Sequence, residues 1–284
     1  MPRIAFLGTG LLGAGFAEAA CARGDTVSAW NRTADKARAL AAFGATVAAT
    51  PAEAVRGAER VHLVLRDDDS VEEVLAACRD ALAPEAIVLD HTTTLPARTA
   101  ARAARLEAEG VRYLHCPVFI GPAAARKGKG TILVSGRRDL FDAVQPALAR
   151  QAETVRFLGE RPDLAAVHKL AGNVFNMGMT GLIADALAVG KGAGVAGAEL
   201  LETLALSQSA NVVNGRGRAM VQGDFTPSFD LAMARKDLQL MMDTALPDTL
   251  AMVPGLAARM DALLAEGHSQ DDFAVVGKRS VHAG

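Results

Sequence analysis

Two polar residues four positions apart, Lys169 and Asn173, stand in a long and otherwise largely apolar stretch of the sequence. In a helix this spacing places both side chains on one face. A lysine whose pKa is lowered by burial or by a neighbouring cation can donate a proton to a reactant and take it back. An asparagine amide can donate a hydrogen bond to the same oxygen. The pair therefore has the chemistry of a general acid–base with a polar partner, if the fold holds a reactant beside it.

A glycine-rich run near the N-terminus could hold that reactant. It reads G-T-G-L-L-G, follows the predicted buried strand 4–7 and opens a predicted helix. The first glycine allows a tight turn, the second lets the backbone approach a pyrophosphate, and the third lets helix and strand pack closely. The phosphates would lie against free N–H groups at the helix start. In this position the run predicts a dinucleotide site made by Gly8, Thr9, Gly10, Leu11, Leu12 and Gly13.

The end of the second predicted strand indicates which dinucleotide is bound. Proteins that bind NAD place Asp or Glu there, where the carboxylate accepts a hydrogen bond from the ribose 2′-hydroxyl. This chain has Asn31, Arg32 and Thr33 instead. No carboxylate is present there to repel a 2′-phosphate, and Arg32 can bind that phosphate through charge-assisted hydrogen bonds. The sequence therefore predicts NADP as the cofactor.

The elements that must position these residues alternate between strand and helix up to about residue 160. Near-continuous apolar runs are typical of strands that are buried on both faces of a parallel sheet. The alternation predicts an α/β fold with a doubly wound, Rossmann-type sheet. The expected strands are 3–7, 26–30, 60–65, 86–89, 112–115, 131–134 and 154–157. The expected helices include 34–43, 70–82, which Ser70 would cap, and 96–109, which Pro96 would begin.

After Pro162 the strand pattern stops, and helical patterns cover 163–191, 198–214, 229–245 and 247–266. The first of these helices is long and apolar, so it cannot face water all round. We therefore expect two domains. A cofactor-binding domain would cover 1–162, and an all-helical domain for substrate binding and dimerisation would cover 163–284. The protein is expected to be a homodimer or a homotetramer.

The composition excludes several classes of function. The 284 residues carry 30 Lys and Arg against 32 Asp and Glu, which gives no attraction for nucleic acid or for an anionic membrane surface. The apolar start resembles a signal peptide, but its three spaced glycines and Glu18 argue against one. The three cysteines are too few and too scattered for a disulfide framework or a metal site. We expect a cytoplasmic protein that acts on a small molecule, needs no metal and does not enter a membrane.

With these features in place, the chain resembles the β-hydroxyacid dehydrogenase family over nearly its full length. That family includes 3-hydroxyisobutyrate dehydrogenases and reductases of glyoxylate or succinic semialdehyde. Its segments D-x-S-T-x-x-P and A-x-x-G-x-x-T resemble residues 90–96 and 125–131. Its K-x-x-x-N pair matches Lys169 and Asn173, which the resemblance makes catalytic. The resemblance also implies cofactor contacts for Leu65, Thr93 and Lys236, and a substrate-lining role for Phe229.

The chain departs from the family in the loop that holds the substrate carboxylate of its members. The family's D-A-P-V-S-G-G reads H-C-P-V-F-I-G here, so Phe119 and Ile120 stand where the resemblance implies a serine and a glycine. The resemblance assigns Phe119, Ile120 and Gly121 to the substrate site, and their bulk predicts an apolar or uncharged group there. The glycine run that precedes the family's lysine is also absent, and R-P-D-L over 161–164 stands in its place.

Three functions fit these patterns. The first is NADP-dependent hydride transfer between the nicotinamide and a small carbonyl or β-hydroxy compound, with Lys169 as the general acid–base. The second is imine reduction. The apolar loop favours it and the lysine disfavours it, since many imine reductases carry another proton donor at that place. The third is a non-catalytic NADP-binding module, against which the Lys169–Asn173 pair argues.

Overall fold

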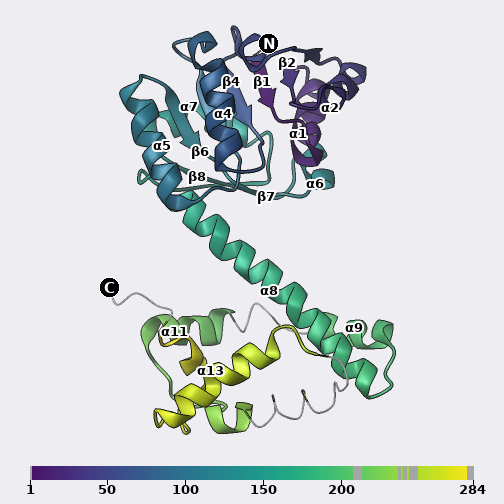
Figure 1. Ribbon diagram of the computed structural model, residues 1–284, viewed down its shortest axis with the longest axis vertical. Coiled ribbons are helices and arrows are strands. Elements are labelled where there is room, and N and C mark those ends of the chain that lie inside the picture. The colour runs from purple at the N-terminus through teal and green to yellow at the C-terminus, as the bar shows by residue number, and fades with distance from the viewer. Residues whose placement is uncertain (1, 207–212, 236–237, 239–241, 243–248, 280–284) are drawn as a thin grey trace. The chain divides into compact units, whose positions relative to one another are not determined.

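A nine-stranded sheet organises the N-terminal half of the chain in the computed structural model (Figure 1), which describes residues 2–206, 213–235, 238, 242 and 249–279. The strands are β1 (Arg3–Leu7), β2 (Thr26–Trp30), β3 (Thr46–Val47), β4 (Arg60–Leu63), β5 (Ile87–Asp90), β6 (Arg112–His115), β7 (Val118–Phe119), β8 (Thr131–Ser135) and β9 (Thr154–Gly159). Their order is β3-β2-β1-β4-β5-β6-β8-β7, and β9 pairs with β8. The strands from β3 to β6 in this order pair in parallel, whereas β8 is antiparallel to β6 and β7. The predicted doubly wound α/β sheet is confirmed.

The strand order reverses at β1. The chain continues from β1 to β2 on one side and later returns to β4 on the other. In doubly wound sheets, ligands bind in the crevice outside the carboxyl ends of the strands at such a switch point. Leu7 ends β1 and Leu63 ends β4, so the glycine-rich run that follows Leu7 lies at this crevice.

Alternate residues of β1 face opposite sides of the sheet, as the period of a strand requires. Ile4 and Phe6 belong to one buried cluster, and Ala5 and Leu7 belong to another. The first cluster also holds side chains of α1 (Leu11–Ala22), α6 (Pro122–Arg126) and α7 (Arg138–Leu148). The second holds side chains of α3 (Pro51–Val55), α4 (Asp68–Cys78) and α5 (Pro96–Ala108). This unit therefore consists of three layers, with helices on both faces of the sheet. Burial of each large apolar side chain contributes about 1.5–3 kcal/mol to the free energy of folding.

The strands predicted from apolar runs are present, and three have the predicted bounds: 3–7, 26–30 and 112–115. The sequence does not predict β3 or β7, because a two-residue strand has no periodicity to detect. The helix predicted over 34–43 is α2 (Ala34–Arg38) followed by a 3-10 helix (Ala39–Phe43). Pro96 begins α5, as predicted.

The prediction that Ser70 caps the next helix is wrong. Asp67 is the N-cap of α4, which begins at Asp68. The Asp67 carboxylate accepts from the Ser70 backbone N–H (2.9 Å) and from the Ser70 hydroxyl (2.6 Å). A carboxylate three residues before Ser70 therefore satisfies the free N–H groups one turn earlier than the sequence pattern suggests.

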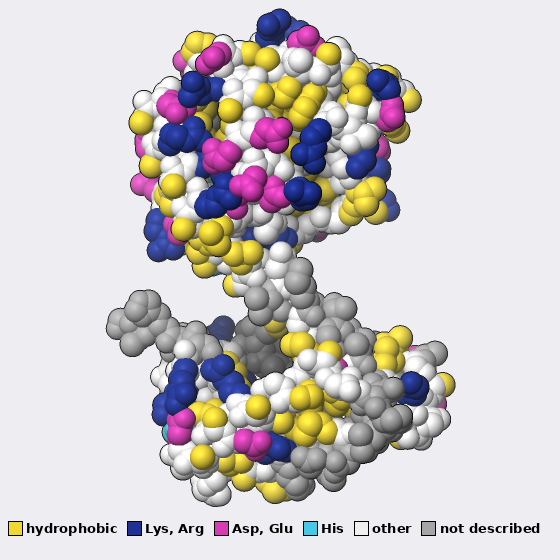
Figure 2. Space-filling view, in the orientation of Figure 1, with side chains coloured by type: hydrophobic (Ala, Val, Ile, Leu, Met, Phe, Trp, Pro, Cys, Tyr) yellow, Lys and Arg dark blue, Asp and Glu magenta, His cyan; other side chains and the backbone are white. Residues whose placement is uncertain are grey.

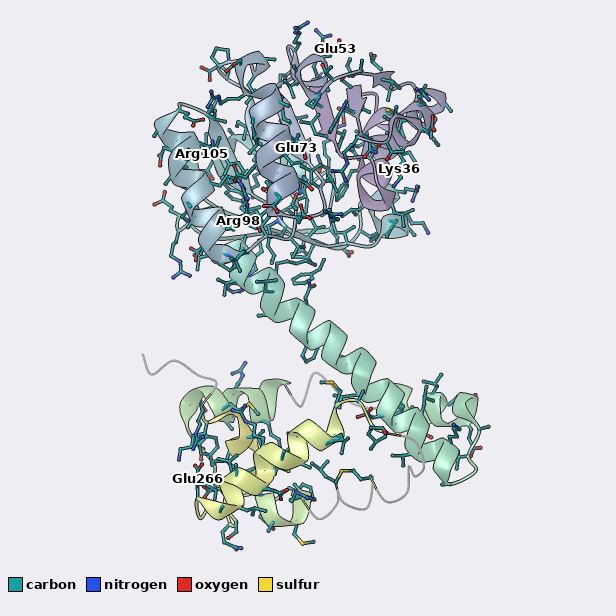
Figure 3. The ribbon with its side chains drawn as sticks, viewed as in Figure 1. Lys36, Glu53, Glu73, Arg98, Arg105 and Glu266 are labelled. Atoms are coloured by element: carbon teal, nitrogen blue, oxygen red, sulfur yellow. The ribbon has the colours of Figure 1, made fainter. Side chains whose placement is uncertain are left out.

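Ion pairs join α5 to α4 and to the end of β5. The buried Arg102 of α5 donates to Asp68 (2.6 Å) and Glu72 (2.8 Å) of α4. Its guanidinium also lies 3.6 Å from the Asp90 carboxylate, which accepts from the backbone N–H of Thr92 (3.0 Å). These contacts fix the loop that follows β5. Two further arginines of α5, which Figure 3 labels, are Arg98 and Arg105.

The C-terminal half is helical, as predicted. Its described helices are α8 (Leu164–Gly192), α9 (Gly197–Ala205), α11 (Arg218–Gln222) and α13 (Val253–Ala265), with a π-helical segment (Val213–Gly217) and a 3-10 helix (Phe273–Gly277). Asp185 of α8 caps α13, because its carboxylate accepts from the backbone N–H groups of Met252 (2.7 Å) and Val253 (2.9 Å). The helix predicted from residue 247 is observed from Val253 onward. Part of the helix predicted over 229–245 lies outside the described residues.

The chain divides into two compact units, Met1–Asn173 and Val174–Gly284. The predicted boundary after residue 162 marks the change from strands to helices. The first unit extends beyond it into α8, because the first turns of α8 pack on the sheet and bury Ala165 and Ala166.

Charges of both signs are interspersed over the face of the sheet unit that Figure 2 shows. Arg98 of α5, for example, pairs with Asp69 of α4 (2.7 Å). Within the described residues, no helix is long and apolar enough to cross a membrane.

Candidate active site

The three glycines of the run 8–13 have three different surroundings. Gly8 has a φ of +98°, and a Cβ there would lie 2.3 Å from the Val64 carbonyl oxygen, so no other residue fits. A Cβ on Gly13 would lie 2.0 Å from the Gly8 carbonyl oxygen. A Cβ on Gly10, the N-cap of α1, would meet no described atom within 4 Å. The turn therefore leaves open space at the start of α1, which fits a pyrophosphate.

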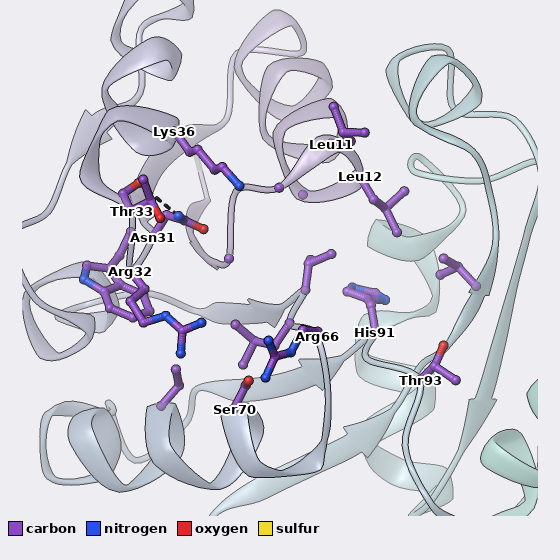
Figure 4. A pocket seen from close by; sticks show the side chains of 18 of the residues that line it. Leu11, Leu12, Asn31, Arg32, Thr33, Lys36, Arg66, Ser70, His91 and Thr93 are labelled. Atoms are coloured by element: carbon purple, nitrogen blue, oxygen red, sulfur yellow. Dashed lines mark hydrogen bonds between the residues drawn. The ribbon is translucent and has the colours of Figure 1, made fainter.

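Asn31 ties this turn to the end of β2. Its Oδ1 accepts from the backbone N–H of Thr9 (2.9 Å), and its Nδ2 donates to the carbonyl oxygen of Thr33 (3.0 Å, dashed in Figure 4). Both ends of the Asn31 amide are thus engaged by the backbone. Arg32 consequently projects from a turn whose backbone is fixed on both sides.

Three cationic side chains gather beside this turn. Arg32, Lys36 and Arg66 line the same cavity, and Figure 4 shows Arg32 and Arg66 extending toward the space beside Ser70. Arg66 pairs with Asp67 (2.8 Å). Among the described residues, neither Arg32 nor Lys36 has a carboxylate partner. The local excess of positive charge favours a phosphate group.

The sequence patterns do not indicate a site role for Lys36 or Arg66. Lys36 lies four positions after Arg32, and that short spacing is a signal that could have found it. Arg66 follows β4, and it reaches Arg32 only because β2 and β4 flank β1 in the sheet. Nothing in the local sequence indicates that arrangement.

The cavity has a volume of about 520 Å³ and includes both this cationic end and Lys169. Its described lining also includes His91 and Thr93 from the segment after β5, and Val118 and Ile120 from β7 and its end. Thr9 is buried within the turn and lies outside the described lining. The predicted cofactor residues that do line the cavity are Gly8, Gly10, Leu11, Leu12, Gly13, Asn31, Arg32, Thr33, Leu65 and Thr93.

The start of α8 is anchored to the sheet and places Lys169 at the cavity. The buried Ser135 at the end of β8 donates from its hydroxyl to the Pro162 carbonyl oxygen (2.7 Å) and accepts from the Ala165 N–H (3.1 Å). Lys169 follows one turn later, half-buried, with its Nζ 4.4 Å from the centre of the Phe119 ring. Burial lowers the pKa of Lys169 from its usual value, since desolvation disfavours the ammonium.

His91 lies in the cavity lining, but both of its ring nitrogens are engaged. Its Nδ1 donates to the Cys116 carbonyl oxygen (2.7 Å), so the Nε2 of the neutral ring accepts from the Nδ1 of His62 (2.8 Å). Burial lowers the pKa of His91 to about 4 and places that of His62 well below its usual value. Both rings are therefore neutral near pH 7, and His91 has no nitrogen left for a reactant.

The other predicted site residues lie outside the described lining of this cavity. Asn173 is one turn beyond Lys169 on α8, the ring of Phe119 contacts Lys169 from outside that lining, and Gly121 is the exposed N-cap of α6. Phe229 belongs to the helical unit, where its ring packs edge-on against Phe273 with the centroids 5.7 Å apart. Lys236 lies outside the described residues. The functional roles of the predicted site residues, in the lining or outside it, stay predictions. In the described ranges, no group of His, Cys, Asp and Glu side chains could hold a metal ion.

The strand order, the glycine turn at the switch point and the adjoining cations define a dinucleotide-binding α/β domain followed by a helical domain. Two family models match the chain: the NAD binding domain of 6-phosphogluconate dehydrogenase over residues 3–159, and the NAD-binding domain of NADP-dependent 3-hydroxyisobutyrate dehydrogenase over residues 164–278. The chain belongs to the β-hydroxyacid dehydrogenase family, and it is an NAD(P)-binding oxidoreductase. The resemblance seen in its motifs is confirmed.

Curated relatives span bacteria and animals. The chain is 28% identical to an uncharacterized oxidoreductase of Shewanella frigidimarina, with 86% of each chain covered. It is 28% identical to the 3-sulfolactaldehyde reductase of Escherichia coli over 97% of this chain and 95% of that enzyme. It is 27% identical to the human cytokine-like nuclear factor N-PAC over 99% of this chain, but it spans about half of that protein's length (52%).

Solved structures share the whole fold. A reductive aminase from Aspergillus terreus in complex with NADPH and ethyl levulinate is 26% identical, with a TM-score of 0.86 and with 97% of this chain and 98% of that chain covered. An imine reductase from a Pseudomonas species has a TM-score of 0.89 at 20% identity and covers 98% and 99% of the two chains. The second likeness shows the fold alone.

Proposed function

We propose that this protein uses NADP to transfer a hydride between the nicotinamide ring and a small carbonyl or β-hydroxy compound, with Lys169 as the general acid–base. The observation that carries the proposal is that Lys169 and the glycine turn line one cavity. A dinucleotide whose phosphates lie at the turn has its ribose 2′-position at Arg32 and its other end at Lys169. When bound, the nicotinamide supplies the hydride for reduction and accepts it in oxidation.

The cationic end of the cavity supports NADP over NAD. Arg32 and Lys36 have no carboxylate partner within the described structure, so their charges are available to a 2′-phosphate. Glu73 is the one carboxylate in the described lining. It comes from α4 and not from the end of β2, where NAD-binding proteins place theirs. The Aspergillus terreus reductive aminase was solved with NADPH, which agrees with this choice.

Lys169 donates a proton to the carbonyl oxygen during reduction and accepts it from the hydroxyl during oxidation. Burial of Lys169 lowers its pKa, which brings both steps closer to neutral pH. Asn173, one helical turn away, donates a hydrogen bond to the same oxygen or orients the substrate. A positioned acid–base of this kind contributes about two to four decades of rate.

Reduction of imines is the second candidate. Phe119 and Ile120 favour it, because they place apolar surface beside Lys169 where a carboxylate-binding loop would present a hydroxyl. The likeness to the reductive aminase of Aspergillus terreus over 97% of the chain agrees with it. The third hypothesis, a non-catalytic NADP-binding module, gains no support from the half-buried Lys169 at the cavity.

Replacement of Lys169 tests the proposal. Lys169→Ala should lower kcat by about two to four decades, because the proton donor is lost. NADPH binding should be nearly unchanged, because Arg32 and the glycine turn remain. Steady-state turnover and titration of NADPH fluorescence measure the two quantities. Lys127→Ala, at an exposed lysine outside the cavity, is the matched control and should behave as wild type.

A substrate panel separates the candidates. Oxidation of NADPH in the presence of aldehydes, β-keto acids and cyclic imines identifies the reacting group. Undiminished turnover by Lys169→Ala would remove the general acid–base role. NADPH binding without turnover of any of these compounds would favour the non-catalytic module.

The three unpaired cysteines support a cytoplasmic location for the enzyme.

A further inference from the structure

The aromatic ring of Phe119 lies between Lys169 and Gly172 of α8. The Lys169 Nζ is 4.4 Å from the ring centroid, well within the distance at which a ring attracts a cation. A Cβ on Gly172 would lie 2.2 Å from the ring's Cζ and 2.7 Å from its Cε1. Lys169 and Gly172 are three residues apart and share one face of α8. The ring therefore occupies the space that the missing Gly172 side chain leaves, directly beside the ammonium.

Strand pairing holds the ring in this place. Phe119 ends β7, and its backbone pairs with Thr131 of β8. Gly130, just before β8, has a φ of +98°, and a Cβ there would lie 2.7 Å from the Phe119 carbonyl oxygen. Position 130 therefore also has to be glycine. Two glycines 42 positions apart in the sequence thus make room for one phenylalanine, one at its backbone and one at its ring.

No acidic group in the described structure pairs with Lys169. His91, a titratable side chain of the same cavity lining, is neutral with both nitrogens engaged. Just before α8, Asp163 pairs with Arg161 (2.7 Å), and on α8 His168 is exposed. The other charged groups of the cavity, at its cofactor-phosphate end, are Arg32, Lys36, Arg66 and Glu73. The face of the Phe119 ring is consequently the electron-rich surface that contacts the ammonium.

We propose that Phe119 is a positioning and specificity residue: its ring holds the Lys169 ammonium at the cavity and makes the adjoining part of the substrate site apolar. This inference rests on the proposed function, because it assigns the partner of the proposed acid–base. A substrate carboxylate beside the ring would lose its hydration against an apolar surface and would compete for Lys169 itself. The substrate class that fits is an aldehyde, ketone or imine whose substituent on the Phe119 side is uncharged and apolar.

Substitutions at Phe119 should move the pKa of Lys169 in opposite directions. Leucine keeps the apolar volume but has no ring to favour the charged form, so Phe119→Leu should lower the pKa by about half a unit to one unit. Phe119→Tyr keeps the ring face and should leave the pKa near its wild-type value. Phe119→Ser admits water, which favours the ammonium, and should raise the pKa.

Gly172→Ala tests the same geometry from the other side. The added methyl has to displace the ring, and the cost of this overpacking is offset in part because alanine is the better helix former. The Lys169 pKa should therefore shift, and thermal unfolding checks that the variant is still folded. Gly178→Ala is the matched control on the same helix, since a Cβ there meets no described atom within 4 Å. It should leave the Lys169 pKa unchanged.

The measurement needs neither substrate nor turnover. The full-length protein is labelled with lysine carrying ¹³C at Cε, Lys169→Arg assigns the signal by its absence, and NMR titration gives the pKa in each variant. The ordered shifts for leucine, tyrosine and serine, with a shift in Gly172→Ala, support the positioning role. A Lys169 pKa that is the same in wild type, Phe119→Leu and Gly172→Ala overturns it.

A second experiment tests the proposed role of Phe119 in substrate specificity with pairs of matched substrates. For a ketone and the matching keto acid, Phe119→Ser/Ile120→Gly should raise kcat/KM for the acid relative to the ketone by tenfold or more, because a hydroxyl and free N–H groups then face the carboxylate. An unchanged ratio overturns the specificity role. If the wild type turns over no carbonyl or imine at all, the proposed function fails, while the titration still decides the positioning role.

Discussion

Arg32 is the side chain whose charge should decide between the two dinucleotides. It leaves a turn that Asn31 fixes, it lines the cavity, and it has no carboxylate partner among the described residues. A hydrogen bond to a charged group contributes about 1.5–3 kcal/mol, so Arg32→Gln should weaken NADP binding by roughly tenfold to a hundredfold. NAD, which lacks the phosphate, should bind almost as before. Calorimetric titration with each oxidised dinucleotide measures the two constants.

The control for this prediction is Arg56→Gln, which removes an exposed arginine that does not line the cavity. It should change neither affinity. Equal weakening of NADP and NAD by Arg32→Gln would show that Arg32 supports the turn and does not read the phosphate.

At the residue scale, the sequence predicts those candidate site residues that belong to a local motif, in which neighbours in the chain would bind the same ligand. The glycine run and Arg32 are of this kind. Arg66 is not, because it lines the same cavity as Arg32 only when the strand order places β4 beside β1. The contact between Phe119 and Gly172 joins residues 53 positions apart. The sequence flags Phe119 as unusual for the family, but only the fold shows which glycine makes room for its ring.

At the element scale, two buried histidines connect β4 to the segment after β5. His62 stands on β4 and stacks on Phe6 of β1 with the ring centroids 4.7 Å apart, and His91 follows β5. The carbonyl of Cys116 accepts from His91, so the hydrogen bond between the rings has a defined direction. Protonation of His91 would place its Nε2–H against the Nδ1–H of His62, and protonation of His62 would bury an unpaired charge. Either change would break the contact between β4 and the segment after β5.

This pair should make the sheet unit sensitive to mild acid. The pKa of His91 in the folded protein is about 4, below its value of about 6.5 in an unfolded chain, so the unfolded state binds more protons between these values. The stabilising contribution is complete above about pH 6.5 and decreases as the pH falls toward 4, by up to about 3 kcal/mol for His91. Urea unfolding at pH 7.5, 6, 5 and 4 measures this dependence.

The readout of that experiment is the slope of stability against pH. Carboxylates titrate in the same range, so the comparison is with His91→Leu, which should have a flatter slope between pH 6.5 and 4. His168→Asn removes an exposed histidine of α8 and should keep the wild-type slope. A His91→Leu slope equal to that of wild type would mean that His91 does not titrate differently on folding.

The elements that the sequence predicts well are those that carry their own signal. β1, β2 and β6 are apolar runs with clear ends, and each has its predicted bounds. The start of α4 is mispredicted because two possible caps, Asp67 and Ser70, lie within one turn, and the choice between them depends on packing. β7 is two residues long and exists only through its pairing with β8, so no local pattern marks it.

At the scale of the whole molecule, α8 exposes more apolar surface than one chain has reason to show. Its large apolar side chains that are at least a third exposed include Val167, Leu170, Phe175 and Leu182. Such a set is typical of a surface that a partner covers. The expected homodimer or homotetramer therefore remains our prediction, and light scattering should give a multiple of 29.5 kDa.

Leu182→Glu should shift this assembly toward the monomer, because a charge would be buried in the interface. Phe43→Glu adds the same charge at a 52% exposed phenylalanine of the sheet unit and should leave the mass unchanged. A wild-type mass of one chain at micromolar concentration would contradict the prediction.

Strand–helix alternation and the glycine run predict the class of fold without any knowledge of packing. The change of pattern falls near residue 162, whereas the first compact unit ends at Asn173 because the first turns of α8 are anchored by Ser135. That anchor is a single buried hydroxyl on β8, which no sequence pattern distinguishes from any other serine.

The glycine turn separates what folding requires from what the ligand requires. At positions 8 and 13 the chain's own carbonyl oxygens exclude a side chain, whereas at position 10 nothing in the described structure does. A library of variants sorted only for intact protein would therefore keep many residues at position 10 and lose nearly all at the other two. Sorting the same library for nucleotide binding would remove the variants that carry a side chain at position 10 as well. Folding therefore requires glycine at positions 8 and 13, whereas at position 10 the requirement for glycine comes from the cofactor.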